Sequence, residues 1–309
     1  MRLAINKWMR ATLKALSYKD VNVKKNYKIC RAVNRRMITP VKAFYEMSDY
    51  KIHLKGREIP VRIFPPEETR SEQVILFFHG GGWVIGDIDS YTKPCASLAK
   101  ATGCRVLSVD YRLAPEHPFP CGLEDCYHAV KTIFENNRSF QADPDNTILM
   151  GDSAGGNLAA AVSLLAKERK EFSIKRQILL YPATADDHSQ TSPFPSIHQF
   201  GEGYLLTVKR LCDYVDLYIP KIEDRKNPYF APLLSEDLSG QPHTLIITAE
   251  YDPLRDEGEA YGEKLRAHGN QVEIHRMKNA LHGFFGLPPK FGHVQKTYEY
   301  IRNFLAYKK

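Results

Sequence analysis

A serine stands between two glycines in the segment Leu149–Leu158, which reads LMGDSAGGNL. Serine suits neither a strand nor a helix interior, and each glycine raises the entropic cost of ordering the backbone. Residues 151–155 match the pattern GxSxG, between an apolar run and an alanine-rich helical pattern. This context predicts a strained strand-to-helix turn that exposes the Ser153 hydroxyl as a nucleophile, with a helix N-terminus favouring developing negative charge. The alternative is a purely structural Gly-Ser turn.

A serine hydroxyl is a weak nucleophile at neutral pH and requires a positioned base, most often histidine. Among the eleven histidines of the chain, His282 follows the last predicted strand, at the same end of the sheet as Ser153. His275 lies within that strand and His293 begins the next helical pattern. The sequence therefore favours His282 as the base.

The base in turn requires a carboxylate that orients it and stabilises the imidazolium. Asp252 directly follows the preceding predicted strand and is the expected partner. An aspartate before a proline is also a good helix N-cap, which would place Pro253 at the first helical position. Glu250 and Asp256 are nearby competitors for the same role.

Three consecutive glycines follow the third predicted strand, in the segment HGGGW at residues 79–83. Glycines let backbone N–H groups approach a substrate closely, and a tetrahedral oxyanion needs two or three such donors. The position of the segment predicts an oxyanion loop that acts together with the amide of Ala154. His79 is expected to hold the loop through hydrogen bonds and not to be the base. The alternative is a flexible turn.

The elements that position these residues alternate between strands and helices. Two alternating runs around Lys55-Gly56 predict a hairpin, and the apolar runs after it predict strands of a mostly parallel, eight-stranded sheet covered by helices. The expected strands after the hairpin are Val74–Gly80, Cys104–Tyr111, Asn146–Gly151, Gln177–Pro182, His243–Glu250 and Val272–Met277. The clearest helical patterns are Gly122–Asn136, Ala154–Lys170, Asp256–His268 and Val294–Tyr307. The fold class is α/β.

One segment interrupts the alternation, because residues 186–222 form a polar, proline-bearing loop and then an amphipathic helix. Such insertions lie beyond the carboxyl ends of the strands, where ligands bind in open α/β sheets. We expect a helical cap made of residues 1–45 and 186–222 on a catalytic domain of residues 46–309. Residues 3–16 predict an amphipathic basic helix, which packs on the protein itself or contacts an anionic surface.

Composition narrows the function classes. Twelve of the 43 Lys and Arg residues lie in residues 1–42, against one of the 36 acidic residues, so the main body is net acidic. The sequence contains no dense run of basic residues with interleaved aromatics, the pattern that would indicate nucleic-acid binding. The six scattered cysteines favour free thiols in the cytoplasm, and no apolar run approaches the ~20 residues of a membrane span. The sequence contains neither an HExxH pattern nor a cluster of Cys, His and Asp residues that would indicate a metal site.

The motifs and their order resemble a known family. HGGGW, DYRLAPEHPFP (Asp110–Pro120), GDSAGGN, DPLRDEG and HGF are similar to the hormone-sensitive-lipase branch of the α/β-hydrolase carboxylesterases, from about residue 74 to the C-terminus. The resemblance implies an α/β-hydrolase fold with an N-terminal helical cap, no cofactor, short acyl esters as substrates and, in many relatives, a homodimer. The residues that it implies are the triad Ser153, Asp252 and His282, the oxyanion amides of Gly81, Gly82 and Ala154, and His79 and Gly80 as support of the loop.

The primary hypothesis is therefore a serine carboxylesterase that hydrolyses short-chain acyl esters through an acyl-enzyme. Deacetylation of sugars or small molecules and amide hydrolysis would use the same residues and stay open. A long-chain lipase fits a cytoplasmic chain less well. A non-catalytic ligand-binding protein on the same scaffold is the alternative from another class, but relatives of that kind lack the histidine found here at position 282.

Overall fold

The computed structural model describes residues 22–36, 45–69 and 71–306. Within these ranges eight strands form one sheet, in the order β1-β2-β4-β3-β5-β6-β7-β8. The hairpin strands β1 and β2 are antiparallel, β2 is also antiparallel to β4, and the remaining pairs are parallel. The predicted fold class is confirmed. The strands are β1 (Ser48–Leu54), β2 (Arg57–Phe64), β3 (Val74–Phe78), β4 (Arg105–Val109), β5 (Thr147–Asp152), β6 (Arg176–Leu180), β7 (His243–Tyr251) and β8 (Val272–Leu281).

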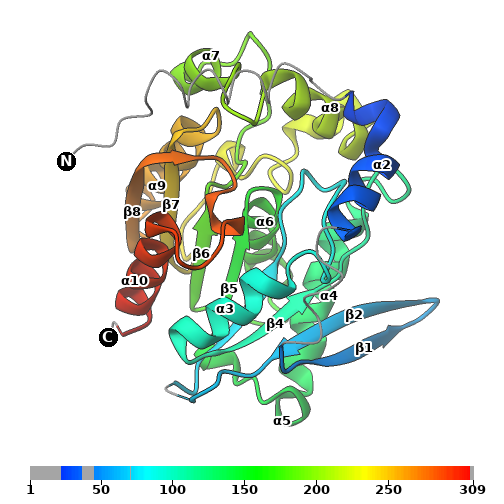
Figure 1. Cartoon of the computed structure of the whole chain (residues 1–309), viewed down its shortest axis with the longest axis vertical. Helices are drawn as coiled ribbons and strands as arrows, with labels where there is room; N and C mark the ends of the chain where they lie inside the picture. Colours follow the sequence, from blue (N-terminus) through cyan, green and yellow to red (C-terminus); the bar gives the residue numbers. More distant parts are fainter. Residues whose placement is uncertain (1–21, 37–44, 70, 307–309) are drawn as a thin grey trace.

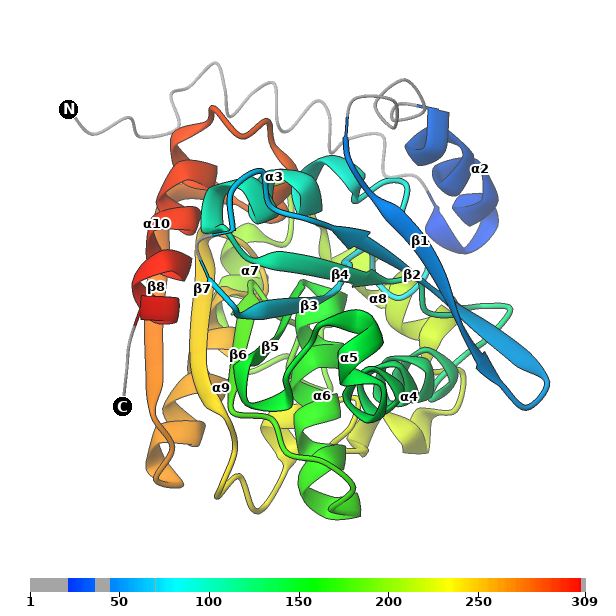
Figure 2. The same cartoon turned by 90° about the horizontal axis from the view of Figure 1, so that it is seen from below.

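Helices cover both faces of the sheet (Figures 1 and 2). One face carries α3 (Thr92–Thr102) and α10 (Gly292–Ala306), and the other carries α4 (Cys121–Glu135), α6 (Ala154–Arg169) and α9 (Arg255–Ala267). The four predicted helices are confirmed, whereas α3 was not predicted. Shorter pieces are α5 (Asn137–Phe140) and the single-turn helices Pro144–Asn146, Ile222–Lys226, Pro232–Leu234 and Phe284–Gly286.

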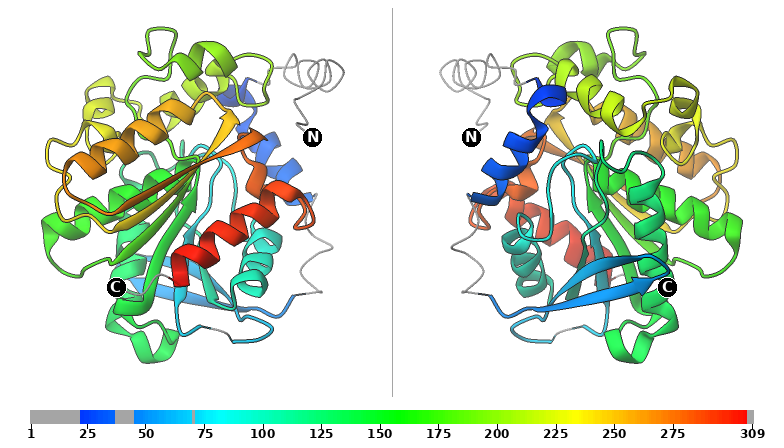
Figure 3. Two further views of the ribbon diagram at one scale, coloured as in Figure 1. Left: turned by 90° about the vertical axis from the view of Figure 1, so that its left-hand side faces the viewer. Right: turned by 90° about the vertical axis from the view of Figure 1, so that its right-hand side faces the viewer.

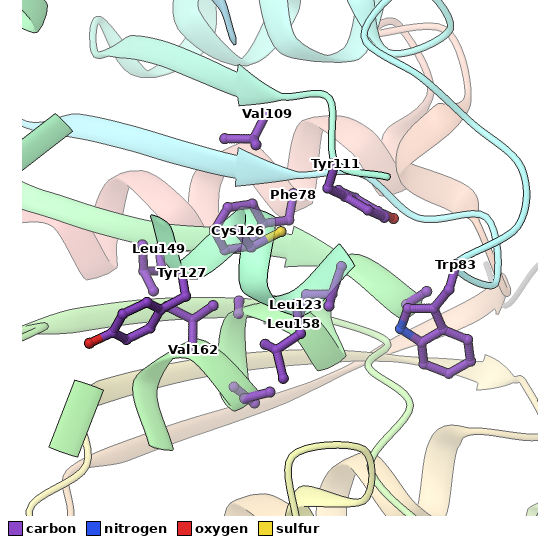
Figure 4. Close-up of a cluster of buried hydrophobic side chains, with 14 of the residues drawn as sticks. Phe78, Trp83, Val109, Tyr111, Leu123, Cys126, Tyr127, Leu149, Leu158 and Val162 are labelled. Atoms are coloured by element: carbon purple, nitrogen blue, oxygen red, sulfur yellow. The ribbon is translucent and has the colours of Figure 1, made fainter. Parts of the chain in front are cut away.

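The central strands are buried on both faces, which explains their continuous apolar runs. Every residue of β3 and of β5 is buried. Helix α6 packs directly on this centre and is buried from Ala154 to Ala166, so its apolar residues occupy all sides instead of one stripe. Figure 4 shows where side chains of the helices pack against side chains of the strands. The helix residues are Leu123, Cys126 and Tyr127 of α4 and Leu158 and Val162 of α6, and the strand residues are Phe78, Val109 and Leu149.

A group of helices lies beyond the carboxyl ends of the parallel strands (Figures 1 and 3). It consists of α2 (Val23–Arg36), α7 (Pro195–Phe200) and α8 (Val208–Tyr218). Helix α2 is held on α8 by a hydrogen bond from the Val23 N–H to Asp213 Oδ2 (3.0 Å) and by an ion pair between Lys24 and Asp216. The amphipathic helix expected within residues 186–222 is therefore α8, while the helix expected at residues 3–16 lies outside the described residues.

Two features bear on the environment of the protein. Within the described ranges, no helix combines the length and the apolar character needed to cross a membrane. All six cysteines lie in the described part of the chain and are free thiols there.

Candidate active site

Ser153 stands in a strained turn between β5 and α6. Its backbone has φ 55° and ψ −119°, a conformation that a residue with a side chain rarely adopts. A Cβ atom at Gly151 would lie 2.1 Å from the Gly155 carbonyl oxygen, and a Cβ at Gly155 would lie 2.0 Å from the Phe78 carbonyl oxygen. Both glycines are therefore required for the close approach of the turn to α6 and β3. The turn places the serine at the N-terminus of α6.

Two hydrogen bonds connect Ser153, His282 and Asp252. His282 Nε2 lies 2.9 Å from Ser153 Oγ, and His282 Nδ1 lies 2.7 Å from Asp252 Oδ2. The Asp252 carboxylate is fully buried and accepts hydrogen bonds, so Nδ1 carries the proton. In the neutral ring Nε2 is then the acceptor and faces the serine hydroxyl. This arrangement can pass a proton from serine to histidine and stabilise the imidazolium that results.

The other carboxylates near Asp252 have different partners. Glu250 accepts the N–H of Asn279 at 2.6 Å, and Asp256 pairs with Arg255. The alternative role of Asp252 as a helix N-cap is wrong in detail, because α9 begins at Arg255 and not at Pro253. Asp252 Oδ1 instead accepts the Leu254 N–H at 2.9 Å, which leaves Oδ2 for the histidine. One carboxylate thus forms the turn and contacts His282.

The two other candidate histidines lie elsewhere. The ring of His275 stacks on Tyr300 with 4.1 Å between ring centroids. His293 Nε2 donates to the Lys278 carbonyl oxygen at 3.1 Å. Strand β8 continues to Leu281, four residues beyond the predicted end, so His282 directly follows it. Of the three candidates, His282 is the one that the fold places at Ser153.

The glycine segment after β3 faces the same pocket. Gly81 (φ +114°) and Gly82 (φ +61°) both have backbones in the region that favours glycine. A Cβ at Gly81 would lie 2.1 Å from the Ile85 carbonyl oxygen, and a Cβ at Gly82 would lie 2.4 Å from the Tyr214 ring. Both glycines line the pocket together with Ser153 and with Ala154, the first residue of α6. Backbone groups therefore surround the serine with no intervening side chain at these positions.

His79 is bonded to the loop that it begins. Its Nδ1–H donates to the Gly80 carbonyl oxygen at 2.8 Å, and its ring stacks on Tyr111 with 4.3 Å between centroids. The Tyr111 hydroxyl donates to the His79 carbonyl oxygen at 2.6 Å. Burial lowers the pKa of His79 to about 4, so the ring is neutral at physiological pH. These contacts hold the glycine segment against the chain that follows β4.

Asp152, which precedes the serine, links the turn to the glycine segment. Its Oδ1 accepts the Gly80 N–H at 2.8 Å, and its Oδ2 accepts the hydroxyls of Tyr91 (2.9 Å) and Tyr181 (3.3 Å). Asp152 was not predicted as a site residue, although a polar residue at the end of a buried strand, directly before the serine, is a signal. Burial raises the pKa of Asp152 to about 6 in spite of these hydrogen bonds.

Because the pKa of Asp152 is raised, the difference in unfolding free energy between the wild type and the variant Asp152→Asn should depend on pH. In the folded protein the Asp152 carboxyl group keeps its proton up to about pH 6, whereas in the unfolded chain it releases the proton near pH 3.8. The stability from this group is thus present below pH 3.8 and is lost as the pH rises through 6. Relative to the variant, the wild type should lose about 3 kcal/mol of unfolding free energy across this window. Urea unfolding of both proteins at several pH values measures it, and a pH-independent difference would contradict the assignment.

The pocket at Ser153 is small, with a cavity volume of about 170 Å³. Pockets for drug-sized ligands are about 300–1,000 Å³, so this one fits a small group next to the serine. Its polar side chains are Tyr91, Asp152, Ser153, His188, Tyr214 and His282, and its apolar wall consists of Trp83, Ala154, Ala183, Leu206, Leu211, Val215 and Leu254. Of these polar side chains, Ser153 and His282 were predicted as site residues, whereas the other four were not.

The chain is similar to known proteins in sequence and in structure. Residues 75–286 match a family described as having the alpha/beta hydrolase fold. The chain is 36% identical to an arylesterase of Saccharolobus solfataricus, over 88% of this chain and 85% of that protein. It is 34% identical to the carboxylesterase NlhH of Mycobacterium tuberculosis, over 83% of this chain and 81% of NlhH. The solved structure of EstE1, a thermostable carboxylesterase from a metagenomic library, matches with a TM-score of 0.82 and 33% identity, covering 91% of this chain and 95% of EstE1. The chain therefore belongs to the hormone-sensitive-lipase branch of the α/β-hydrolase carboxylesterases.

Proposed function

We propose that this carboxylic ester hydrolase cleaves short-chain acyl esters through a serine acyl-enzyme, with Ser153, His282 and Asp252 as the catalytic triad. The observation that carries the proposal is the pair of hydrogen bonds, 2.9 Å and 2.7 Å long, that joins the three side chains in order. The strained turn at Ser153 supports it, because strain of this kind persists where function requires the geometry.

The reaction proceeds in two halves. As Ser153 Oγ attacks the ester carbonyl carbon, its proton moves to His282 Nε2, and Asp252 stabilises the resulting imidazolium. The backbone amides of Gly81, Gly82 and Ala154 bind the oxyanion, with His79 and Gly80 supporting the loop. The C–O bond to the alcohol then breaks, and His282 returns the proton to the departing oxygen. Water attacks the acyl-enzyme with the same proton movements and releases the acid.

A helical cap completes the proposed organisation. We assign α2, α7 and α8 to this cap and the remaining elements to the catalytic domain of residues 46–309. Leu206, Leu211, Tyr214 and Val215, which lie in or next to α8, form part of the pocket wall. Helix α2 contacts that wall indirectly through Asp213 and Asp216. The cap thus determines the space available to the substrate.

The proposed partner is a small-molecule ester, and the proposed location is the cytoplasm. The six free thiols support this location, because cysteines stay reduced there. A homodimer remains a prediction.

The small pocket predicts a preference for short acyl chains. With 4-nitrophenyl esters from acetate to palmitate, kcat/KM should be highest for acetate or butyrate. We expect a fall of at least about a hundredfold for palmitate, since one methylene is worth about 1–3 kcal/mol of discrimination in a closed pocket. Initial rates at equal active enzyme concentration measure the profile. Equal or faster cleavage of palmitate would contradict the short-chain assignment, and no cleavage of any ester by folded protein would contradict ester hydrolysis.

A further inference from the structure

A second histidine forms part of the wall of the pocket that contains Ser153. His188 belongs to the segment between β6 and α7, and its side chain is 2% exposed. The hydrogen bonds of the triad do not involve it. A buried histidine beside a reacting serine needs a physical account, because imidazole is costly to bury without partners.

Glu257, in the first turn of α9, holds this histidine. Its Oε1 accepts hydrogen bonds from His188 Nε2 (3.1 Å), the Thr184 N–H (2.6 Å) and the Ala185 N–H (3.2 Å). The carboxylate is fully buried, so these three donors fix both the ring and the segment that carries it. The chain after β7 therefore orients two histidines of one pocket, His282 through Asp252 and His188 through Glu257.

The other ring nitrogen of His188 has no such partner. His188 Nδ1 is buried and has no hydrogen-bond partner among the residues that the structure describes. Nε2 faces a carboxylate and carries a proton, so Nδ1 accepts in the neutral ring and donates in the imidazolium. Burial lowers the pKa of His188. The charge and the hydrogen bond of Glu257, together with the charges of Asp187 and Asp186, outweigh this effect, so the pKa is raised overall. A buried nitrogen of this kind is normally paired, which makes Nδ1 a group for a ligand to satisfy.

We propose that His188 is a specificity-determining residue, which selects esters that carry a hydroxyl group by pairing that hydroxyl with Nδ1. A hydroxyl both donates and accepts, so it pairs with Nδ1 in either protonation state. Ala183, Leu206 and Leu254 line the same pocket without a polar side-chain atom. A carboxylate on the substrate fits less well than a neutral hydroxyl, because Asp186 and Asp187 add negative charge close to the ring. The inference rests on the proposed ester hydrolysis at Ser153.

Two substitutions distinguish the roles of the two ring nitrogens of His188. His188→Gln places an amide where Nε2 is and keeps a contact to Glu257, whereas His188→Asn places an amide near Nδ1. The substrates are two matched pairs, ethyl 3-hydroxybutyrate with ethyl butyrate and 2-hydroxyethyl butyrate with propyl butyrate, followed by pH-stat titration. The readout is the ratio of kcat/KM within each pair, because the fraction of folded enzyme cancels in the ratio.

The wild type should prefer the hydroxylated ester of one pair by at least about tenfold, the value of one buried hydrogen bond. His188→Gln should lose this preference and His188→Asn should keep it. His198→Gln is the matched control: His198 Nε2 donates to the Ser192 carbonyl oxygen, and the residue does not line the pocket.

Three outcomes would overturn the inference. The first is a wild-type ratio near one for both pairs, and the second is a preference that survives in His188→Gln. The third is its loss in His188→Asn, which would assign the effect to the Glu257 contact and not to Nδ1. If the wild type cleaves none of the four esters, the proposed ester hydrolysis itself is contradicted. Failure of the inference about His188 is thus distinguishable from failure of the proposed function.

Discussion

Replacement of Ser153 by alanine is expected to lower kcat for 4-nitrophenyl butyrate by about a millionfold. The variant lacks the oxygen that forms the acyl-enzyme, so His282 and Asp252 have no nucleophile to activate. The backbone amides at Gly81, Gly82 and Ala154 remain, and a residual rate above that of the uncatalysed reaction is expected from them. Steady-state kinetics measure the loss, with exclusion of contaminating wild-type enzyme.

A covalent probe makes this test independent of turnover. A 4-nitrophenyl alkylphosphonate should add one phosphonyl group to the wild type, located at Ser153 by peptide mass spectrometry, and none to Ser153→Ala. Ser235→Ala is the control, because this serine does not line the pocket, and it should be labelled and active like the wild type. Full labelling or activity of Ser153→Ala would remove the serine from the mechanism.

Replacement of Asp252 by asparagine should lower kcat by about ten-thousandfold. The amide group of asparagine can donate to His282 Nδ1, which would leave the proton on Nε2. Nε2 then faces the serine hydroxyl as a donor and cannot accept its proton. The 2.7 Å contact and the complete burial of Asp252 make this residue the orienting group. Kinetics with 4-nitrophenyl butyrate measure the loss, and thermal unfolding of each variant shows whether it is folded.

Asp256→Asn is the matched control for this prediction. Asp256 is four residues away, pairs with Arg255 and accepts the Ser196 N–H at 2.7 Å, so its loss affects the attachment of α7. We expect a reduction of kcat of less than about tenfold, because Asp256 does not line the pocket and an asparagine can still accept the Ser196 N–H through its amide oxygen. A larger loss from Asp256→Asn than from Asp252→Asn would overturn the assignment of the carboxylate.

Local sequence patterns predicted the elements whose signals lie within a few residues. The apolar runs of the buried strands and the glycines around Ser153 are such signals, because burial on both faces excludes polar side chains and the tight turn excludes a Cβ. Helix α3 was not predicted. Its segment TKPCASLAKAT has a proline in the first turn and mixes small, polar and charged residues with a single leucine, so its apolar face is defined by the contact with α10.

Contacts between distant segments could not be predicted in this way. Asp152 and Gly80 are 72 residues apart, and His188 and Glu257 are 69 apart. Each pair depends on which strand lies beside which in the sheet, and no local pattern encodes this order. The same holds for α2 and α8, whose contact between Val23 and Asp213 spans 190 residues.

The sequence by itself determined the fold class, the strained turn at Ser153 and the order of the candidate catalytic residues, because each depends on short-range backbone geometry and on strand ends. Only the tertiary structure decided that Asp252, and neither Glu250 nor Asp256, reaches His282, since all three carboxylates lie near the carboxyl end of the same strand. It also decided that His188 lines the same pocket as Ser153 and His282. The physical reason is that a carboxylate or an imidazole acquires its chemistry from partners and burial, which exist only once distant segments have packed.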